Sequence, residues 1–120
     1  LCADVFDLLP TLEGKGGYDF IILDPPAFTK SRKTTDNAMR GYKEINYRAM
    51  KLLPRGGYLA TCSCSHFATE EKFVAMLHSA AKDAGVQLRQ IEARQQSCDH
   101  PILWGVEETN YLKFYLFQVV

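Results

Sequence analysis

The feature that most constrains this fold is an apolar run that stops at two consecutive prolines. Residues 18–26 read YDFIILDPP, and the β-branched and aromatic residues in 18–24 are typical of a parallel strand covered on both faces. Proline cannot donate to a sheet ladder, and each proline restricts the residue before it. The strand therefore ends at Asp24, which we expect at the carboxyl edge of a sheet, where the chain turns away.

Strand and helix patterns alternate along the rest of the chain. One segment follows the three-and-four spacing of a helix face, and a second helix is bounded by a capping threonine and a terminating glycine. The first expected elements are a loop over 27–41, a helix over 42–53, a turn over 54–57 and a strand over 58–62. The later ones are a helix from Thr69 to Gly85, a strand over 86–93, an irregular segment over 94–111 and a strand over 112–120. This order predicts an α/β fold with a mostly parallel sheet and an antiparallel terminal strand.

The composition fits one globular domain in a reducing compartment. The 120 residues are 47% hydrophobic and 23% charged, and 14 basic residues balance 14 acidic ones. No apolar run approaches the roughly 18 residues that a transmembrane helix needs. The four cysteines, at positions 2, 62, 64 and 98, lack the even spacing of a disulfide framework. We therefore expect free thiols and a cytoplasmic protein without a membrane partner.

Two of the cysteines lie close together where a strand ends. In LATCSCSH, residues 59–66, Cys62 and Cys64 are two positions apart. Ligand crevices of open α/β sheets lie outside the carboxyl ends of strands, and Asp24 ends the preceding strand, so these side chains are expected to be neighbours. Because alternate residues of a strand share a side, spacing does not separate the two cysteines. Buried core residues, a redox pair and a nucleophile all stay open.

A zinc site is a further alternative for this segment. Cysteine and histidine occur at positions 62, 64, 66, 98 and 100. Structural zinc sites usually space their first two cysteines as C-x2-4-C, and a C-x-C pair with distant partners fits that spacing poorly. We therefore expect no metal.

Five motifs, in this order, resemble those of a known family. They are DPPAF after a strand, LLPRGG before the next strand, TCSCS at its end, DHP, and YLK near the C-terminus. Together they are similar to the C-terminal part of bacterial class I S-adenosylmethionine-dependent RNA methyltransferases. They are most similar to the large-subunit (23S) rRNA 5-methylcytosine methyltransferase I family. The resemblance runs from about Cys2 to the end of the chain.

The resemblance implies that residues 1–120 form the C-terminal half of a Rossmann-like methyltransferase domain, with S-adenosyl-L-methionine as cofactor and 23S rRNA as partner. The glycine-rich motif that cradles the methionine end of the cofactor in such enzymes is absent, since GKGGYD at 14–19 precedes a strand. We therefore expect the cofactor-binding half and a PUA-like domain upstream, and we expect the 120 residues alone to be inactive. An uncovered strand edge would let them self-associate, and a homodimeric parent protein stays open.

The chemistry of this family gives a cysteine a task. Carbon 5 of cytosine is a poor nucleophile, so such enzymes add a thiolate to C6, which makes C5 able to attack the methyl group. The family pattern S-C-S places its nucleophile at Cys64, with Cys62 as the strand neighbour. Asp24 matches the acidic residue of the motif, which would hold the pyrimidine edge and contact the cofactor. Capping of its own loop is the alternative for Asp24.

The resemblance also implies binding residues. Asp4 matches an acidic residue that contacts the adenine of the cofactor, with Phe6 nearby, although any aspartate that starts a helix would look the same. The residues assigned to the flipped base and to RNA phosphates are Pro25, Pro26, Phe28, Lys30, Arg32 and Lys33. The last three belong to segment 30–43, which holds five basic residues against Asp36 alone. A hydrophobic anchor is the alternative for Phe28, and a solvated face is the alternative for the basic segment.

Two rival functions stay open. DPP followed by an aromatic residue also resembles amino-group methyltransferases of adenine or guanine, although Phe28 lies two positions after Pro26 and the cysteine would then have no task. The second rival is a non-catalytic RNA-binding module. His66 is a candidate proton carrier or a solvent-facing loop residue, and the DHP motif at 99–101 is expected to organise its loop.

Overall fold

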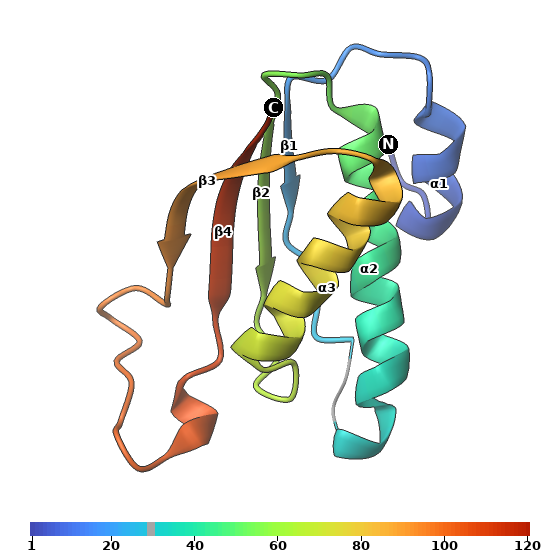
Figure 1. Ribbon diagram of the computed structural model, residues 1–120. Coiled ribbons are helices and arrows are strands. Elements are labelled where there is room, and N and C mark those ends of the chain that lie inside the picture. The colour runs from blue at the N-terminus through green and yellow to red at the C-terminus, as the bar shows by residue number, and fades with distance from the viewer. Residues whose placement is uncertain (29–30) are drawn as a thin grey trace.

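The computed structural model describes residues 1–28 and 31–120. Figure 1 shows one sheet with the helices gathered on one of its faces. The helices are α1 (Val5–Leu12), α2 (Thr35–Leu52) and α3 (Glu70–Ala84), with short 3-10 helices η1 (Arg32–Thr34) and η2 (Glu107–Thr109). The strands are β1 (Phe20–Leu23), β2 (Tyr58–Ser63), β3 (Leu88–Arg94) and β4 (Lys113–Val119). The predicted α/β class is confirmed.

The sheet has the strand order β1-β2-β4-β3, and β4 runs antiparallel to both of its neighbours. β1 and β2 pair in parallel, with Leu23 opposite Thr61. The expected mostly parallel sheet is therefore only partly seen, because β4 separates β2 from β3. The connection from β3 to β4 contains no α-helix in its described residues, 95–112, and without a helical crossover a returning strand pairs antiparallel. The antiparallel terminal strand is confirmed, and it lies inside the sheet.

The core lies between the helices and one face of the sheet. Its centre is formed by Tyr42, Ala49 and Met50 of α2, Phe73 of α3 and Leu59 of β2, all fully buried. Burying a large apolar side chain contributes about 1.5–3 kcal/mol. The contact between α2 and α3 therefore fixes the position of the helical layer over β2.

The other face of the sheet is open in the described part of the chain. Phe20 and Ile22 of β1 are 51% and 69% exposed. Phe20 stacks on Tyr58 of β2, with ring centroids 6.1 Å apart. The prediction that residues 18–24 are covered on both faces is therefore wrong within these residues, because the helices that follow β1 and β2 both pack on the same side.

α2 begins earlier than the sequence predicted. The expected loop over 27–41 is wrong from Thr35 onward, since the helix starts there. Thr35 and Ala38 are buried and continue the helical phase of Tyr42 and Ile45 by two turns. A threonine and an alanine carry a weak apolar signal, so the polar residues around them hid the periodicity.

The ends of α3 confirm their sequence signals. The Thr69 hydroxyl accepts a hydrogen bond from the Lys72 backbone N–H at 3.3 Å, as an N-cap residue does. Gly85 ends the helix with φ 70°, in the left-handed region that favours glycine. These two residues place the beginning of α3 directly after the cysteine segment.

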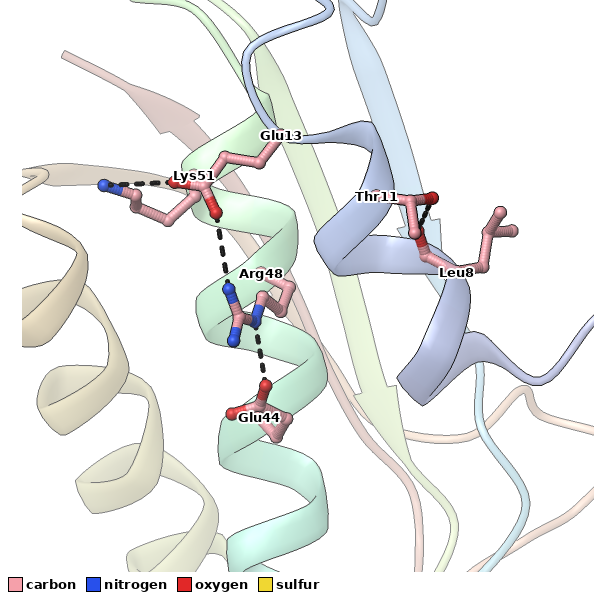
Figure 2. Close-up of polar contacts among 6 residues, drawn as sticks. All are labelled: Leu8, Thr11, Glu13, Glu44, Arg48 and Lys51. Carbon is pink, nitrogen blue, oxygen red and sulfur yellow. Dashed lines mark hydrogen bonds and ion pairs between the residues drawn. The ribbon is translucent and has the colours of Figure 1, made fainter.

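An ion-pair cluster ties the end of α1 to α2 (Figure 2). Glu13, which follows α1, accepts a hydrogen bond from Arg48 at 3.3 Å and forms an ion pair with Lys51 at 3.6 Å. Arg48 also pairs with Glu44 at 2.8 Å, one helical turn away. The side chains are partly exposed, so each pair contributes roughly 0–1 kcal/mol. The cluster orients α1 more than it stabilises the fold.

Candidate active site

The carboxyl ends of β1 and β2 bring together residues that the sequence predicted there. Asp24 directly follows β1, and Cys62 lies near the end of β2. The Cys62 thiol donates to the Asp24 carboxylate at 3.2 Å (Sγ to Oδ1) and to the Leu23 carbonyl at 3.4 Å. Parallel pairing produces this contact, because the carboxyl ends of parallel strands meet at one edge of a sheet.

The two neighbouring cysteines have different environments. β2 ends at Ser63, so the alternation of the strand stops before Cys64. Cys62 is buried at 9% exposure, whereas Cys64 is exposed. Burial, together with the hydrogen bond and the negative charge of Asp24, raises the pKa of the Cys62 thiol to about 12. Cys62 is therefore held as a neutral thiol, and Cys64 is the accessible member of the pair.

We expect iodoacetamide to modify Cys64 much faster than Cys62 in the folded protein at pH 8. A pKa of about 12 instead of 9.0 lowers the thiolate fraction of Cys62 on the order of 10³-fold. Tandem mass spectrometry of peptides after a short exposure measures both rates, with the exposed Cys98 as an internal control. Equal rates of modification of Cys62 and Cys64 in the folded state would contradict the conclusion that Cys62 is a buried neutral thiol and Cys64 is accessible.

A buried polar network connects the end of β2 to α2. The Ser63 hydroxyl donates to the Tyr42 hydroxyl at 3.0 Å, and the Thr61 hydroxyl donates to Asn46 Oδ1 at 2.7 Å. The Asn46 side-chain amide donates in turn to the Tyr42 backbone carbonyl at 2.8 Å. Asn46 is a polar residue on the buried face of α2, and its hydrogen bond with the Thr61 hydroxyl explains why a polar side chain is buried there. The network fixes the backbone from which Cys64 emerges.

Asn46→Ala is expected to lower the free energy of unfolding by about 1–3 kcal/mol. The substitution leaves the buried Thr61 hydroxyl without its acceptor, and an unsatisfied buried polar group costs about that much. Chemical denaturation followed by circular dichroism measures the change. Asn37→Ala, at an exposed position of the same helix, is the control and should stay within about 0.5 kcal/mol of the wild type. Equal effects of the two substitutions would contradict the role of the network.

Lys113, the lysine of the YLK motif, is buried next to the cysteine segment, and no role was predicted for it from the sequence. Lys113 begins β4 opposite Ser63, is 7% exposed, and donates through Nζ to the backbone carbonyls of Ser65 and Tyr111. Burial lowers its pKa to about 8, while the negative charges of Cys64 and Glu70 act in the opposite direction. The signal was present, because the alternation of 112–120 places residue 113 on the buried face.

The aromatic residue of the DPPAF motif packs inward. Phe28 contacts Tyr42, with ring centroids 4.7 Å apart, and Phe6, with centroids 5.9 Å apart. Phe28 therefore connects α1 to α2, the packing of a hydrophobic anchor. Pro25 is half-buried and Pro26 is exposed, so the turn after Asp24 stays accessible on one side.

The residues expected to contact the adenine lie at the start of α1. Asp4 caps this helix, because its Oδ1 accepts the Phe6 backbone N–H at 2.8 Å. The Phe6 side chain is 39% exposed. Asp4 and Phe6 thus share one helix end, and Phe6 joins them to the Asp24 turn through its contact with Phe28.

The basic residues assigned to RNA lie between β1 and α2. Lys33 is exposed in η1, and the backbone of Arg32 begins the same short helix. Lys30 lies outside the described residues. Figure 1 shows the start of α2, which η1 directly precedes, at the end of the molecule toward which β1 points.

The histidines and the DHP motif lie in loops. His66 is exposed and its ring lies over Phe67, with centroids 4.0 Å apart. Asp99 accepts a hydrogen bond from the Ser97 hydroxyl, which holds the pKa of the Asp99 carboxyl below its ordinary range. His100 lies 3.8 Å from the same carboxylate. These contacts are internal to the loop between β3 and β4.

In residues 1–28 and 31–120, no group of three or more His, Cys, Asp and Glu side chains is arranged to hold a metal ion. None of the helices within these ranges combines the length and the apolar character required to cross a membrane.

Solved structures with this arrangement are methyltransferases, although no family model matches the chain. A methyltransferase in complex with SAH aligns with a TM-score of 0.80 and 21% identity, over 98% of this chain and 30% of that one. A SAM-dependent methyltransferase from Streptococcus mutans aligns with a TM-score of 0.78 and 22% identity, with the same coverage of both chains. A DNA modification methylase from Thermus thermophilus aligns with a TM-score of 0.62 and 13% identity, over 98% of this chain and 51% of that one. The chain therefore has the fold of the S-adenosylmethionine-dependent methyltransferases.

Sequence comparison identifies relatives within one named group of methyltransferases. The chain is 41% identical over 118 residues to proteins named ribosomal RNA large subunit methyltransferase I, from Shigella dysenteriae and from Escherichia coli. It is thus a homologue of part of these methyltransferases, and the resemblance carried by the five motifs is confirmed. The matches cover 98% of this chain, which spans about 30% of the length of these relatives.

Proposed function

We propose that the protein uses S-adenosyl-L-methionine to methylate a base of large-subunit rRNA, and that the target atom is C5 of a cytosine. The single observation that carries the C5 assignment is the contrast between the two cysteines. Cys64 is exposed beyond the end of β2, whereas Cys62 is buried against Asp24. Amino-group methylation needs no thiol, so an accessible cysteine just beyond the end of β2 favours the carbon target.

The reaction begins with Cys64. Its thiolate attacks C6 of the cytosine, forms a carbon–sulfur bond and makes C5 nucleophilic. The cofactor, when bound, supplies the methyl group that C5 receives. A base then removes the C5 proton, and the electron pair of that bond restores the C5–C6 double bond as the Cys64 sulfur leaves as thiolate. Asp24, at the end of β1, is proposed to hold the pyrimidine edge while charge develops on the ring.

The remaining site residues are proposed to bind cofactor and RNA. Asp4 has one carboxylate oxygen that caps α1, and its other oxygen is proposed to face the adenine amino group, beside the partly exposed Phe6. The turn residues Pro25, Pro26 and Phe28 are proposed to shape the pocket for the flipped base, with Phe28 acting from beneath as an anchor. Lys30, Arg32 and Lys33 are proposed to contact phosphates, which would position the RNA without reading its sequence.

Methylation of rRNA by the longest natural chain that contains this sequence tests the proposal. The protein is incubated with cofactor and unmodified large-subunit rRNA, and the RNA is digested to nucleosides and measured by mass spectrometry. We expect 5-methylcytidine. A methyl group on an exocyclic nitrogen would instead support the amino-group rival. RNA binding without any methylated nucleoside would support a non-catalytic module.

A further inference from the structure

Lys113 is a buried charge that the proposed reaction steps do not use. It lies at the start of β4, opposite the last residue of β2, and Figure 1 shows that α3 begins at this same end of the strands. Its ammonium donates to the backbone carbonyls of Ser65 and Tyr111. Within residues 1–28 and 31–120, no carboxylate lies within ion-pair distance of it. A backbone carbonyl could be satisfied by a neutral donor, so these contacts alone do not account for a charge.

Burying this charge costs free energy. Moving an ammonium from water into a protein interior carries a penalty of several kcal/mol, after relaxation, unless nearby negative groups offset it. Lys113 is 7% exposed, and desolvation is the main cause that lowers its pKa. A methionine at this position would avoid the penalty and fill a similar volume. The presence of lysine therefore points to a negative group nearby that benefits from the cation.

The negative groups near Lys113 are few. Glu70, the first residue of α3, accepts a hydrogen bond from the Tyr115 hydroxyl, and its charge also acts on Lys113. Cys64 acts on Lys113 in the same direction, and it directly precedes the residue whose carbonyl Lys113 holds. His66 and Arg94 line the same small cavity of about 60 Å³ as Lys113 and Glu70. Lys113 is the buried cation of this group, and it contacts the cysteine segment at the Ser65 carbonyl.

We propose that Lys113 is the positioning residue of the nucleophile: it holds the turn that carries Cys64 through the Ser65 carbonyl and supplies a positive charge near Cys64 when its sulfur attacks. This proposal rests on the proposed function, in which Cys64 is the nucleophile. The contact with Ser65 sets the direction in which Cys64 leaves β2. The charge stabilises the negative sulfur that attacks the ring. Lys113 touches no substrate and acts through Cys64.

The test is the alkylation rate of Cys64 by iodoacetamide between pH 6 and pH 10, measured by tandem mass spectrometry on the longest natural chain. K113M removes charge and donors, K113Q removes the charge and keeps an N–H donor, and K113R keeps both. K72M, at an exposed lysine of α3, is the matched control. Circular dichroism confirms that each variant is folded before its rate is compared, and K113Q provides the comparison if K113M does not fold.

We expect the Cys64 rate at pH 7 to fall about tenfold in K113M and K113Q and to stay within about twofold of the wild type in K113R and K72M. Lys113 has a pKa of about 8, so its ammonium is present below that pH and lost above it. The difference between wild type and the neutral variants should therefore shrink above pH 8. Equal rates at every pH in folded K113Q, or a loss in K113R as large as in K113M, would overturn the proposal.

The alkylation rate needs neither cofactor nor RNA. The proposal on Lys113 and the proposed function can therefore fail separately. Alkylation that depends on Lys113 in a protein that forms no 5-methylcytidine would contradict the proposed function alone. Formation of 5-methylcytidine with alkylation independent of Lys113 would contradict the role of Lys113 alone.

Discussion

Cys64→Ala is expected to lower methyl transfer to rRNA by at least about 10³-fold, because without the thiolate no adduct forms at C6 and C5 remains a poor nucleophile. Cofactor and RNA binding should change little, since the side chain is small and exposed. The measurement is single-turnover transfer of a radiolabelled methyl group from the cofactor to unmodified rRNA. RNA affinity is measured in parallel by filter binding.

Cys62→Ala is the matched control for this experiment. It removes a thiol two positions away that is buried and neutral, so we expect transfer to stay within about tenfold of the wild type. The remaining loss would come from Asp24, whose carboxylate loses one hydrogen-bond donor. A severe loss in Cys62→Ala with activity retained in Cys64→Ala would reverse the assignment of the nucleophile.

The second large effect is on stability. Phe73→Ala is expected to lower the free energy of unfolding by about 3–5 kcal/mol, the usual range for deleting a fully buried phenylalanine. The Phe73 ring lies 6.1 Å from the rings of both Tyr42 and Tyr115, measured between centroids. Its removal therefore leaves a cavity between α2, α3 and β4. Urea denaturation followed by circular dichroism measures the change.

The control for this substitution is Val74→Ala, at the next residue of the same helix. Val74 is only half-buried and the change removes fewer atoms, so the expected loss is about 1 kcal/mol. Because Tyr42 also accepts a hydrogen bond from Ser63, Phe73→Ala should reduce methyl transfer as well as stability. A loss of stability in Phe73→Ala no larger than in Val74→Ala would contradict the packing described for this core.

Local signals predicted the elements whose ends carry special residues. Thr69 and Gly85 bound α3, and the prolines after Asp24 end β1, because a cap, a left-handed glycine and a missing N–H act within a few residues. α1 was not predicted, since Pro10 inside an eight-residue helix argues against one. The place of β4 between β2 and β3 depends on long-range pairing, which no local pattern encodes.

The sequence predicted only those parts of the candidate site that depend on local signals and on the order of the strands. The order of strands was sufficient to bring Asp24 and Cys62 together. Separating Cys62 from Cys64 required knowing that β2 ends at Ser63, because alternation holds only while the strand continues. The contact of Lys113 with Ser65 joins residues 48 positions apart in the chain and appears only in three dimensions.

Covalent trapping tests the central claim most directly. The longest natural chain is incubated with S-adenosyl-L-methionine and large-subunit rRNA that contains 5-fluorocytidine, and the products are separated under denaturing conditions. Fluorine at C5 leaves no proton for the base to remove, so the cysteine cannot be released. We predict a denaturation-resistant protein–RNA adduct in the wild type and in Cys62→Ala, and none in Cys64→Ala. Methylation of unmodified rRNA without any trapped adduct, or an adduct that persists in Cys64→Ala, would contradict the account.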